Sequence, residues 1–185
     1  MRTYTVEEIR RCFSTSTDFN EIFDAFQAAL DSRIGEVELY RLLFWNHSLS
    51  PDEVCLFGGK LAREFPALAY DVYLWLAGVF EVTCSSADNF ERALEYYRKA
   101  ARARPEEPDP YLDACDCHDP DLNIPPRGSL IEFLKQGLSH VRSPRSLCLR
   151  LAHLYALAGD AERSELYRRK AEEGPADAAD SPPAA

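Results

Sequence analysis

The residue types best suited to bind a metal lie together at one place in the chain, Cys115-Asp116-Cys117-His118. Thiolate and imidazole groups are common ligands of zinc, but structural zinc sites usually separate their cysteines by about two to four residues. Here one residue separates the two cysteines, and no second pair follows at a recognisable spacing. We therefore expect a polar turn with ordinary cysteines and no bound metal.

The alternative is a metal- or redox-responsive regulator that uses Cys115, Cys117 and His118. Three further side chains could complete such a site in space: His140, Cys148 and His153.

Acidic residues are concentrated between Glu106 and Asp121, a segment with seven carboxylates and no lysine or arginine. At its end, Asp119-Pro120-Asp121-Leu122-Asn123 superficially resembles a calcium-binding loop. Such a loop needs glycine at its sixth position and glutamate at its twelfth, where this chain has Ile124 and Leu130. We expect a solvated acidic turn instead. The negative segment is also a candidate docking edge for a basic partner.

The sequence carries no recognisable catalytic motif. None of Gly-x-Ser-x-Gly, His-Glu-x-x-His or Gly-x-Gly-x-x-Gly occurs. The segment Gly58-Gly59-Lys60-Leu61 lacks both the first glycine and the hydroxyl of a phosphate-binding loop. The sequence thus predicts a protein that is not an enzyme and needs no cofactor. The enzymatic alternative is a site assembled from distant residues around His118 and the acidic loop, because a triad needs no sequence motif.

The charge of the chain argues against extended anionic partners. With 21 Lys and Arg against 31 Asp and Glu, the formal net charge is -10. An acidic protein repels phosphate backbones, so we expect no nucleic acid partner. Two groups of basic residues end helical segments: Arg98, Lys99, Arg102 and Arg104, and Arg163, Arg168, Arg169 and Lys170. They complement helix dipoles or, alternatively, contact an anion or an acidic peptide.

Hydropathy and cysteine usage favour a cytoplasmic protein. The longest apolar segment, 67–82, has 16 residues and contains Asp71 and Glu81, short of the roughly 20 apolar residues that cross a bilayer. The first residues contain no apolar core of a signal peptide, and acidic residues follow at Glu7 and Glu8. The six cysteines are dispersed, as expected for reduced, buried thiols. We expect no membrane association.

Apolar residues recur every three or four positions along almost the whole chain, which predicts one helix after another. Two capping boxes mark helix starts, at Thr5 to Glu8 and at Ser50 to Glu53. The second of these helices should end before Pro66. Its interior Gly58-Gly59 is best explained by close approach of another helix. The apolar segment 67–82 should form the most buried helix.

The chain also has an internal spacing that indicates repeats. Pro66, Pro105 and Pro144 are 39 residues apart, and each interval can hold two helices. Helical hairpins at this period are typical of an α-solenoid. Two segments carry a recognisable pattern, Ala93-x3-Tyr97-x2-Ala100-x4-Pro105 and Leu151 to Asp160 with its turn glycine. Both resemble the tetratricopeptide repeat (TPR) family, with best matches over 67–105 and 144–173.

This resemblance implies an all-α fold of antiparallel helical hairpins, stacked as a short TPR-like α-solenoid over 1–173. Residues 1–66 would be degenerate N-terminal helices, and 111–141 match the pattern poorly. In the second matching segment, Ser164 and Arg168 stand where alanine and an aromatic residue are usual. The Pro- and Ala-rich tail, 174–185, is expected to be disordered.

The family binds other proteins along the face made by the first helix of each repeat. The resemblance therefore implies a non-catalytic scaffold or adaptor that holds a partner peptide or protein in a concave groove. Carried onto this chain, the contact residues are Ser146, Leu149, Arg150, His153 and Leu157, with Tyr73 and Leu76 as possible neighbours. Arg150 alone corresponds to the basic residues that some family members use to clamp a carboxylate.

Overall fold

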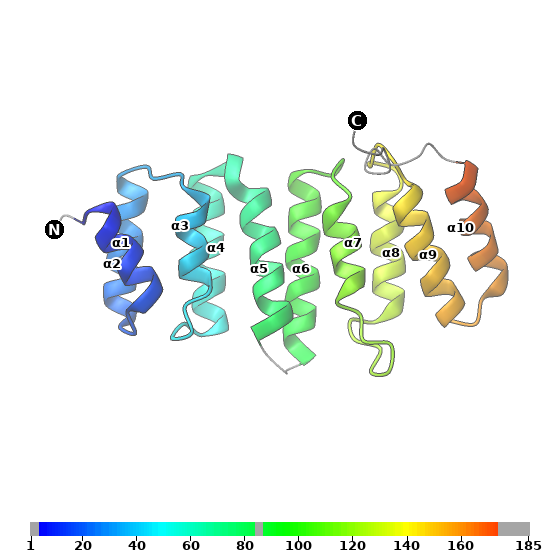
Figure 1. Cartoon of the computed structure of the whole chain (residues 1–185), viewed down its shortest axis with the longest axis horizontal. Coiled ribbons are helices and arrows are strands. Elements are labelled where there is room, and N and C mark those ends of the chain that lie inside the picture. The colour runs from blue at the N-terminus through cyan, green and yellow to red at the C-terminus, as the bar shows by residue number, and fades with distance from the viewer. Residues whose placement is uncertain (1–3, 84–86, 174–185) are drawn as a thin grey trace, which may run out of the picture. The chain divides into compact units, whose positions relative to one another are not determined.

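The computed structural model describes residues 4–83 and 87–173, and within these ranges the chain is all-α, as predicted (Figure 1). The helices are α1 (Val6–Thr15), α2 (Phe19–Asp31), α3 (Val37–Phe44), α4 (Pro51–Glu64), α5 (Ala69–Thr83), α6 (Ala87–Ala103), α7 (Asp109–Asp116), α8 (Arg127–Gly137), α9 (Arg145–Leu157) and α10 (Ala161–Glu173). A short 3-10 turn, Pro66–Leu68, precedes α5. The predicted disordered tail lies outside the described residues.

The chain divides into two compact units, 1–85 and 86–185. The boundary falls inside the predicted repeat over 67–105, which stays a prediction. No single helix in the described ranges is both long and apolar enough to cross a membrane. The segments 51–64 and 66–82 pass that test only as a pair, bent by 120° at the break between them.

Local side-chain chemistry fixes where two helices of unit 1 begin. The Thr5 hydroxyl accepts a hydrogen bond from the Glu8 amide, and the Glu8 carboxylate accepts one from the Thr5 amide at 2.8 Å. Ser50 and Glu53 repeat the arrangement at the start of α4. Both predicted capping boxes are therefore confirmed, and α4 ends at Glu64, ahead of the proline as predicted.

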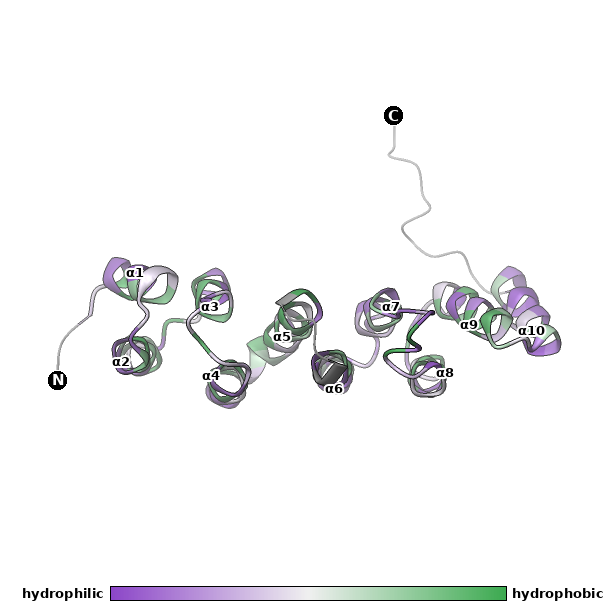
Figure 2. Ribbon diagram, turned by 90° about the horizontal axis from the view of Figure 1, so that it is seen from below, coloured by the Kyte–Doolittle hydropathy of each residue, from purple (hydrophilic) through white to green (hydrophobic). Residues whose placement is uncertain are grey.

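Unit 1 arranges its helices in two layers, with α1, α3 and α5 in one and α2 and α4 in the other (Figure 2). Buried aromatic rings fill the space between them; Phe26 meets Phe57 edge to face at 4.8 Å. The Tyr40 hydroxyl donates to the Ile34 carbonyl at 2.7 Å, and burial raises the pKa of Tyr40 to about 12.

A glycine permits the close packing of α4 on α5. A methyl group built on Gly58 would lie 2.3 Å from the Leu76 side chain, whereas one on Gly59 would meet nothing within 4 Å. The close helix approach predicted from the glycine pair is thus confirmed at Gly58. Leu76 is fully buried, which contradicts its suggested place beside the binding face.

Unit 2 contains α6 to α10, with α7 and α9 in one layer and α6 and α8 in the other (Figure 2). The segment that matched the repeat pattern poorly also folds as a helical pair, α7 and α8. Its helices meet where the rings of Tyr111 and Phe133 lie 4.7 Å apart. Gly137, at the end of α8, leaves no room for a methyl group, which would lie 2.7 Å from Leu147 and 2.9 Å from Tyr111.

The α9–α10 hairpin has the tight turn predicted for it. Gly159 has φ +75°, a conformation that glycine adopts without strain. The buried Ser164 hydroxyl donates to the Ala152 carbonyl at 2.9 Å across the hairpin. Tyr167, one position before Arg168, supplies the aromatic ring and stacks on Tyr155 at 5.6 Å. The two departures from the repeat pattern are therefore accommodated.

Candidate functional site

Five of the predicted contact residues share one side of α9. Ser146, Leu149, Arg150, His153 and Leu157 follow the spacing that places side chains on one helix face. The opposite side is buried; its members are Leu147, Cys148, Leu151, Ala152, Leu154 and Tyr155.

Leu149 is 49% exposed and Leu157 is 41% exposed, and His153 between them is also exposed. An exposed leucine is ordinary by itself. Two leucines spaced by two helical turns form an apolar stripe, which can anchor a partner. We call Leu149, His153 and Leu157 the α9 stripe.

An acidic stripe lies next to the α9 stripe. Asp109, Asp113 and Asp116 follow one another at helical spacing along α7, and all three are exposed. The guanidinium of Arg150 forms an ion pair with Asp116 at 2.5 Å, which places the two helix faces side by side. These carboxylates belong to the acidic segment that the sequence offered as a docking edge for a basic partner. Because Asp116 already engages Arg150, this arginine is a poor carboxylate clamp.

Tyr73 belongs to a different unit from the other predicted contact residues. It lies half-buried on α5 in unit 1, whereas the five residues of α9 lie in unit 2. Unit 2 by itself thus contains the two stripes of α7 and α9.

The Cys115, Cys117 and His118 side chains are each engaged by the protein. Burial raises the pKa of the Cys115 thiol to about 12, although Arg150 nearby opposes the shift. The Cys117 thiol lies 3.1 Å from the Ala114 carbonyl, to which it donates. The imidazole Nδ1 of His118 lies 3.0 Å from the Pro125 carbonyl. Across the described residues, no three His, Cys, Asp or Glu side chains are placed to hold a metal ion.

The acidic loop after α7 is organised by its own backbone. The Asp119 carboxylate accepts hydrogen bonds from the amides of Asp121 and Leu122, at 2.9 and 3.0 Å. The backbones of Asp119 and Ile124 pair with each other. The carboxylate thus closes a turn of the kind that aspartate favours, which agrees with the predicted acidic turn.

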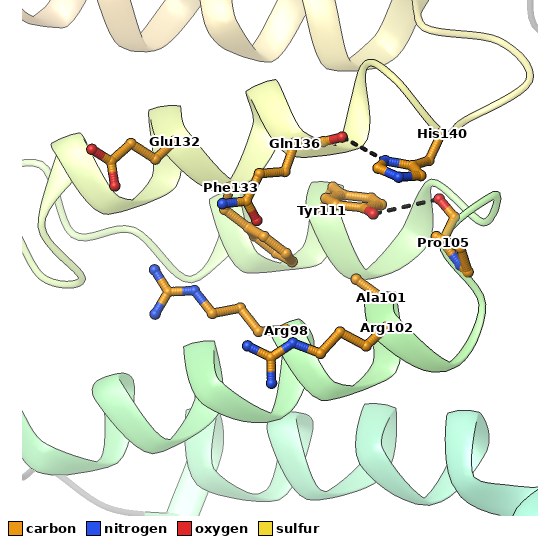
Figure 3. A pocket seen from close by; sticks show the side chains of 9 residues that line it. All are labelled: Arg98, Ala101, Arg102, Pro105, Tyr111, Glu132, Phe133, Gln136 and His140. Carbon is orange, nitrogen blue, oxygen red and sulfur yellow. Dashed lines mark hydrogen bonds between the residues drawn. The ribbon is translucent and has the colours of Figure 1, made fainter.

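Sequence patterns did not reveal a pocket of about 480 Å³ within unit 2 (Figure 3). It lies between α6 and α8, with Tyr111 of α7 on its wall. The lining residues are Arg98, Ala101, Arg102, Pro105, Tyr111, Glu132, Phe133, Gln136 and His140. The group of basic residues at the end of α6 could have indicated this pocket. Their spacing alone, however, did not show which of these side chains point toward α8.

The pocket does not have the arrangement of a general acid–base pair. His140 and Glu132 lie at opposite ends of it (Figure 3). The Nδ1 atom of His140 lies 2.8 Å from the Gln136 carbonyl, which holds the ring at the helix end. A catalytic pair needs hydrogen-bond reach between its members or to the substrate atom they share.

Comparisons with known proteins agree with the fold. No protein-family model matches the chain, and no curated protein matches it significantly. Among solved structures, the crystal structure of MamA protein is similar, with a TM-score of 0.51 and 16% sequence identity, over 91% of this chain and 88% of that chain. MamA is a TPR-like protein. The chain therefore has an all-α fold similar to that of a helical repeat protein.

Proposed function

We propose that this protein is a non-catalytic interaction scaffold that binds a partner peptide or protein on the α7 and α9 face of unit 2. The observation that carries the proposal is the exposed α9 stripe beside the acidic stripe of α7. The helical repeat fold supports it, because stacked helices present extended binding surfaces.

The chemistry of the two stripes describes the partner. Leu149 and Leu157 offer apolar contacts, and burying one such side chain is worth roughly 1.5–3 kcal/mol. The acidic stripe would attract lysine or arginine and speed the encounter. An amphipathic segment with apolar anchors on one side and basic residues on the other fits both stripes.

The test begins with crosslinking. A photoreactive amino acid at position 153 should crosslink a discrete partner, identified by mass spectrometry, and the same probe at Glu165 of α10 serves as the control. The purified partner is then titrated against the Leu149→Asp, Leu157→Asp double variant. We expect its affinity to fall at least thirtyfold, because two apolar contacts are lost and charges are introduced.

The matched control is Leu166→Asp, since Leu166 is an exposed leucine on α10. It should leave the affinity unchanged, and circular dichroism should show that both proteins stay folded. If the double variant bound the partner as tightly as the wild type, the α9 stripe would not be the binding surface.

A further inference from the structure

We propose that the pocket between α6 and α8 is a second binding site, which accepts a single carboxylate side chain of an acidic peptide segment. It goes beyond the α7 and α9 face, because its charged residues come from α6 and α8 and its net charge is opposite.

The pocket holds two arginines that form no ion pair with any described residue. Arg98 and Arg102 are one helical turn apart on α6, and both line the pocket (Figure 3). Neither makes an ion pair within the described part of the chain. Their neighbour Lys99, in contrast, pairs with Glu95 at 2.7 Å. The two guanidinium groups are thus available to an anion.

Aromatic contacts hold the first of these arginines in place. The Arg98 guanidinium lies over the Phe133 ring, 6.0 Å from its centre, and Arg98 is half-buried. The ring of Tyr111 packs on Phe133 and donates its hydroxyl to the Pro105 carbonyl. Because these rings form an apolar wall beside the guanidinium groups, they suit the methylene groups of an aspartate or glutamate side chain.

The remaining polar groups favour a carboxylate over a phosphate. The geometry of a guanidinium group suits carboxylate and phosphate equally, because it can donate two parallel hydrogen bonds to either. Glu132 also lines the pocket, however, and has no ion pair within the described residues. Together with Arg98 and Arg102 it leaves a single net positive charge in the lining, which one carboxylate neutralises and a doubly charged phosphate exceeds. The acidic protein as a whole also disfavours polyanions such as nucleic acid.

The test is an NMR titration of the full chain with the peptide acetyl-Gly-Ser-Leu-Glu-Glu-Leu-Ser-Gly-amide. Matched peptides carry glutamine in place of both glutamates, or phosphoserine in place of one. The glutamate peptide should shift the Arg98 side-chain resonance and the amides of α6 and α8 in a saturable way. The glutamine peptide should bind at least tenfold more weakly.

Variants then locate the site. Arg98→Gln with Arg102→Gln should weaken the glutamate peptide about tenfold, since it removes two charge-assisted contacts that are partly exposed. The control is Arg168→Gln with Arg169→Gln on α10, which changes the net charge equally and should have no effect. Glu132→Gln should tighten binding about twofold and should help the phosphoserine peptide more.

Three results would overturn the proposal: equal binding of the glutamine peptide, equal weakening by the α10 control, or a phosphoserine peptide bound more than tenfold tighter than the glutamate peptide. None of these results concerns the α9 stripe, so the proposed function is tested separately.

Discussion

The two helical pairs of unit 2 reach the same architecture by different means. The α9–α10 hairpin has a short turn at Gly159 and a hydrogen bond between Ser164 and Ala152. The α7–α8 pair is joined by a long acidic loop and held by side chains far apart in sequence, such as Tyr111 and Phe133. The α9–α10 hairpin is therefore specified by local interactions, and the α7–α8 pair by packing between distant residues. This difference explains why only the α9–α10 segment matched the repeat pattern.

The first prediction tests whether α7 is as firmly packed as α9 despite its long loop. Because burial raises the pKa of Cys115 to about 12 from 9.0, its thiolate is scarce at pH 8. The thiolate is the reactive form. We therefore expect iodoacetamide at pH 8 to modify Cys115 at least a hundredfold more slowly in the folded protein than in urea, measured by mass spectrometry of the Cys115 peptide.

Raising the pH toward 12 should speed this reaction, because the thiolate becomes populated only there. A rate at pH 8 equal to that in urea would mean that α7 opens freely. That result would reopen the alternative in which the Cys115, Cys117 and His118 cluster acts as a redox regulator.

The second prediction breaks the packing of the α7–α8 pair. Gly137→Val would force a side chain against Tyr111 and Leu147, where even a methyl group lies within 3.0 Å of both. Overpacking of this kind costs about 1–3 kcal/mol, and we expect the upper part of that range for the loss in free energy of unfolding. Urea denaturation followed by circular dichroism measures it.

Gly128→Ala in the same helix is the matched control. A methyl group there meets nothing within 4 Å, so the variant should be neutral or more stable by up to about 1 kcal/mol, the helix-propensity gain of alanine over glycine. If both variants had the same stability, Gly137 would not be a packing position.

Features that depend on neighbouring residues could be predicted from the sequence. The capping boxes at Thr5 and Ser50, the end of α4 before Pro66, and the turn at Gly159 follow from local chemistry. The spacing of the α9 residues also placed them on one helix face, while their role in binding stays a prediction.

Features that depend on distant residues could not be predicted. The Arg150 to Asp116 ion pair joins positions that only the fold brings together. The direction of Arg98 and Arg102 toward α8 depends on how α6 packs in unit 2. In the same way, the cluster of Cys115, Cys117 and His118 has residue types that suit a metal ion. The side chains of Cys117 and His118 contact backbone carbonyls instead. Residue type alone does not specify which atoms meet.

The third prediction concerns the local turn of the α9–α10 hairpin. Gly159→Ala places a Cβ atom in the left-handed region, which costs roughly 1–2 kcal/mol, and we expect a loss of about 1 kcal/mol in the same urea experiment. Gly159→Asn should lose less than half as much, because asparagine tolerates this conformation better. Equal losses for the two variants would show that the backbone conformation is not the cause.

The last and smallest effect is expected at Ser164, where the repeat pattern has alanine. Ser164→Ala removes a hydrogen bond worth about 1 kcal/mol, but alanine is the better helix former by up to about 0.5 kcal/mol. The Ala152 carbonyl lies within α9 and keeps its helical hydrogen bond, so no buried polar group is left unpaired. The free energy of unfolding should therefore fall by no more than about 0.5 kcal/mol. A loss above 2 kcal/mol would show that the hairpin depends on this hydroxyl, and the α9–α10 pair would then rely on a specific tertiary contact as much as α7–α8 does.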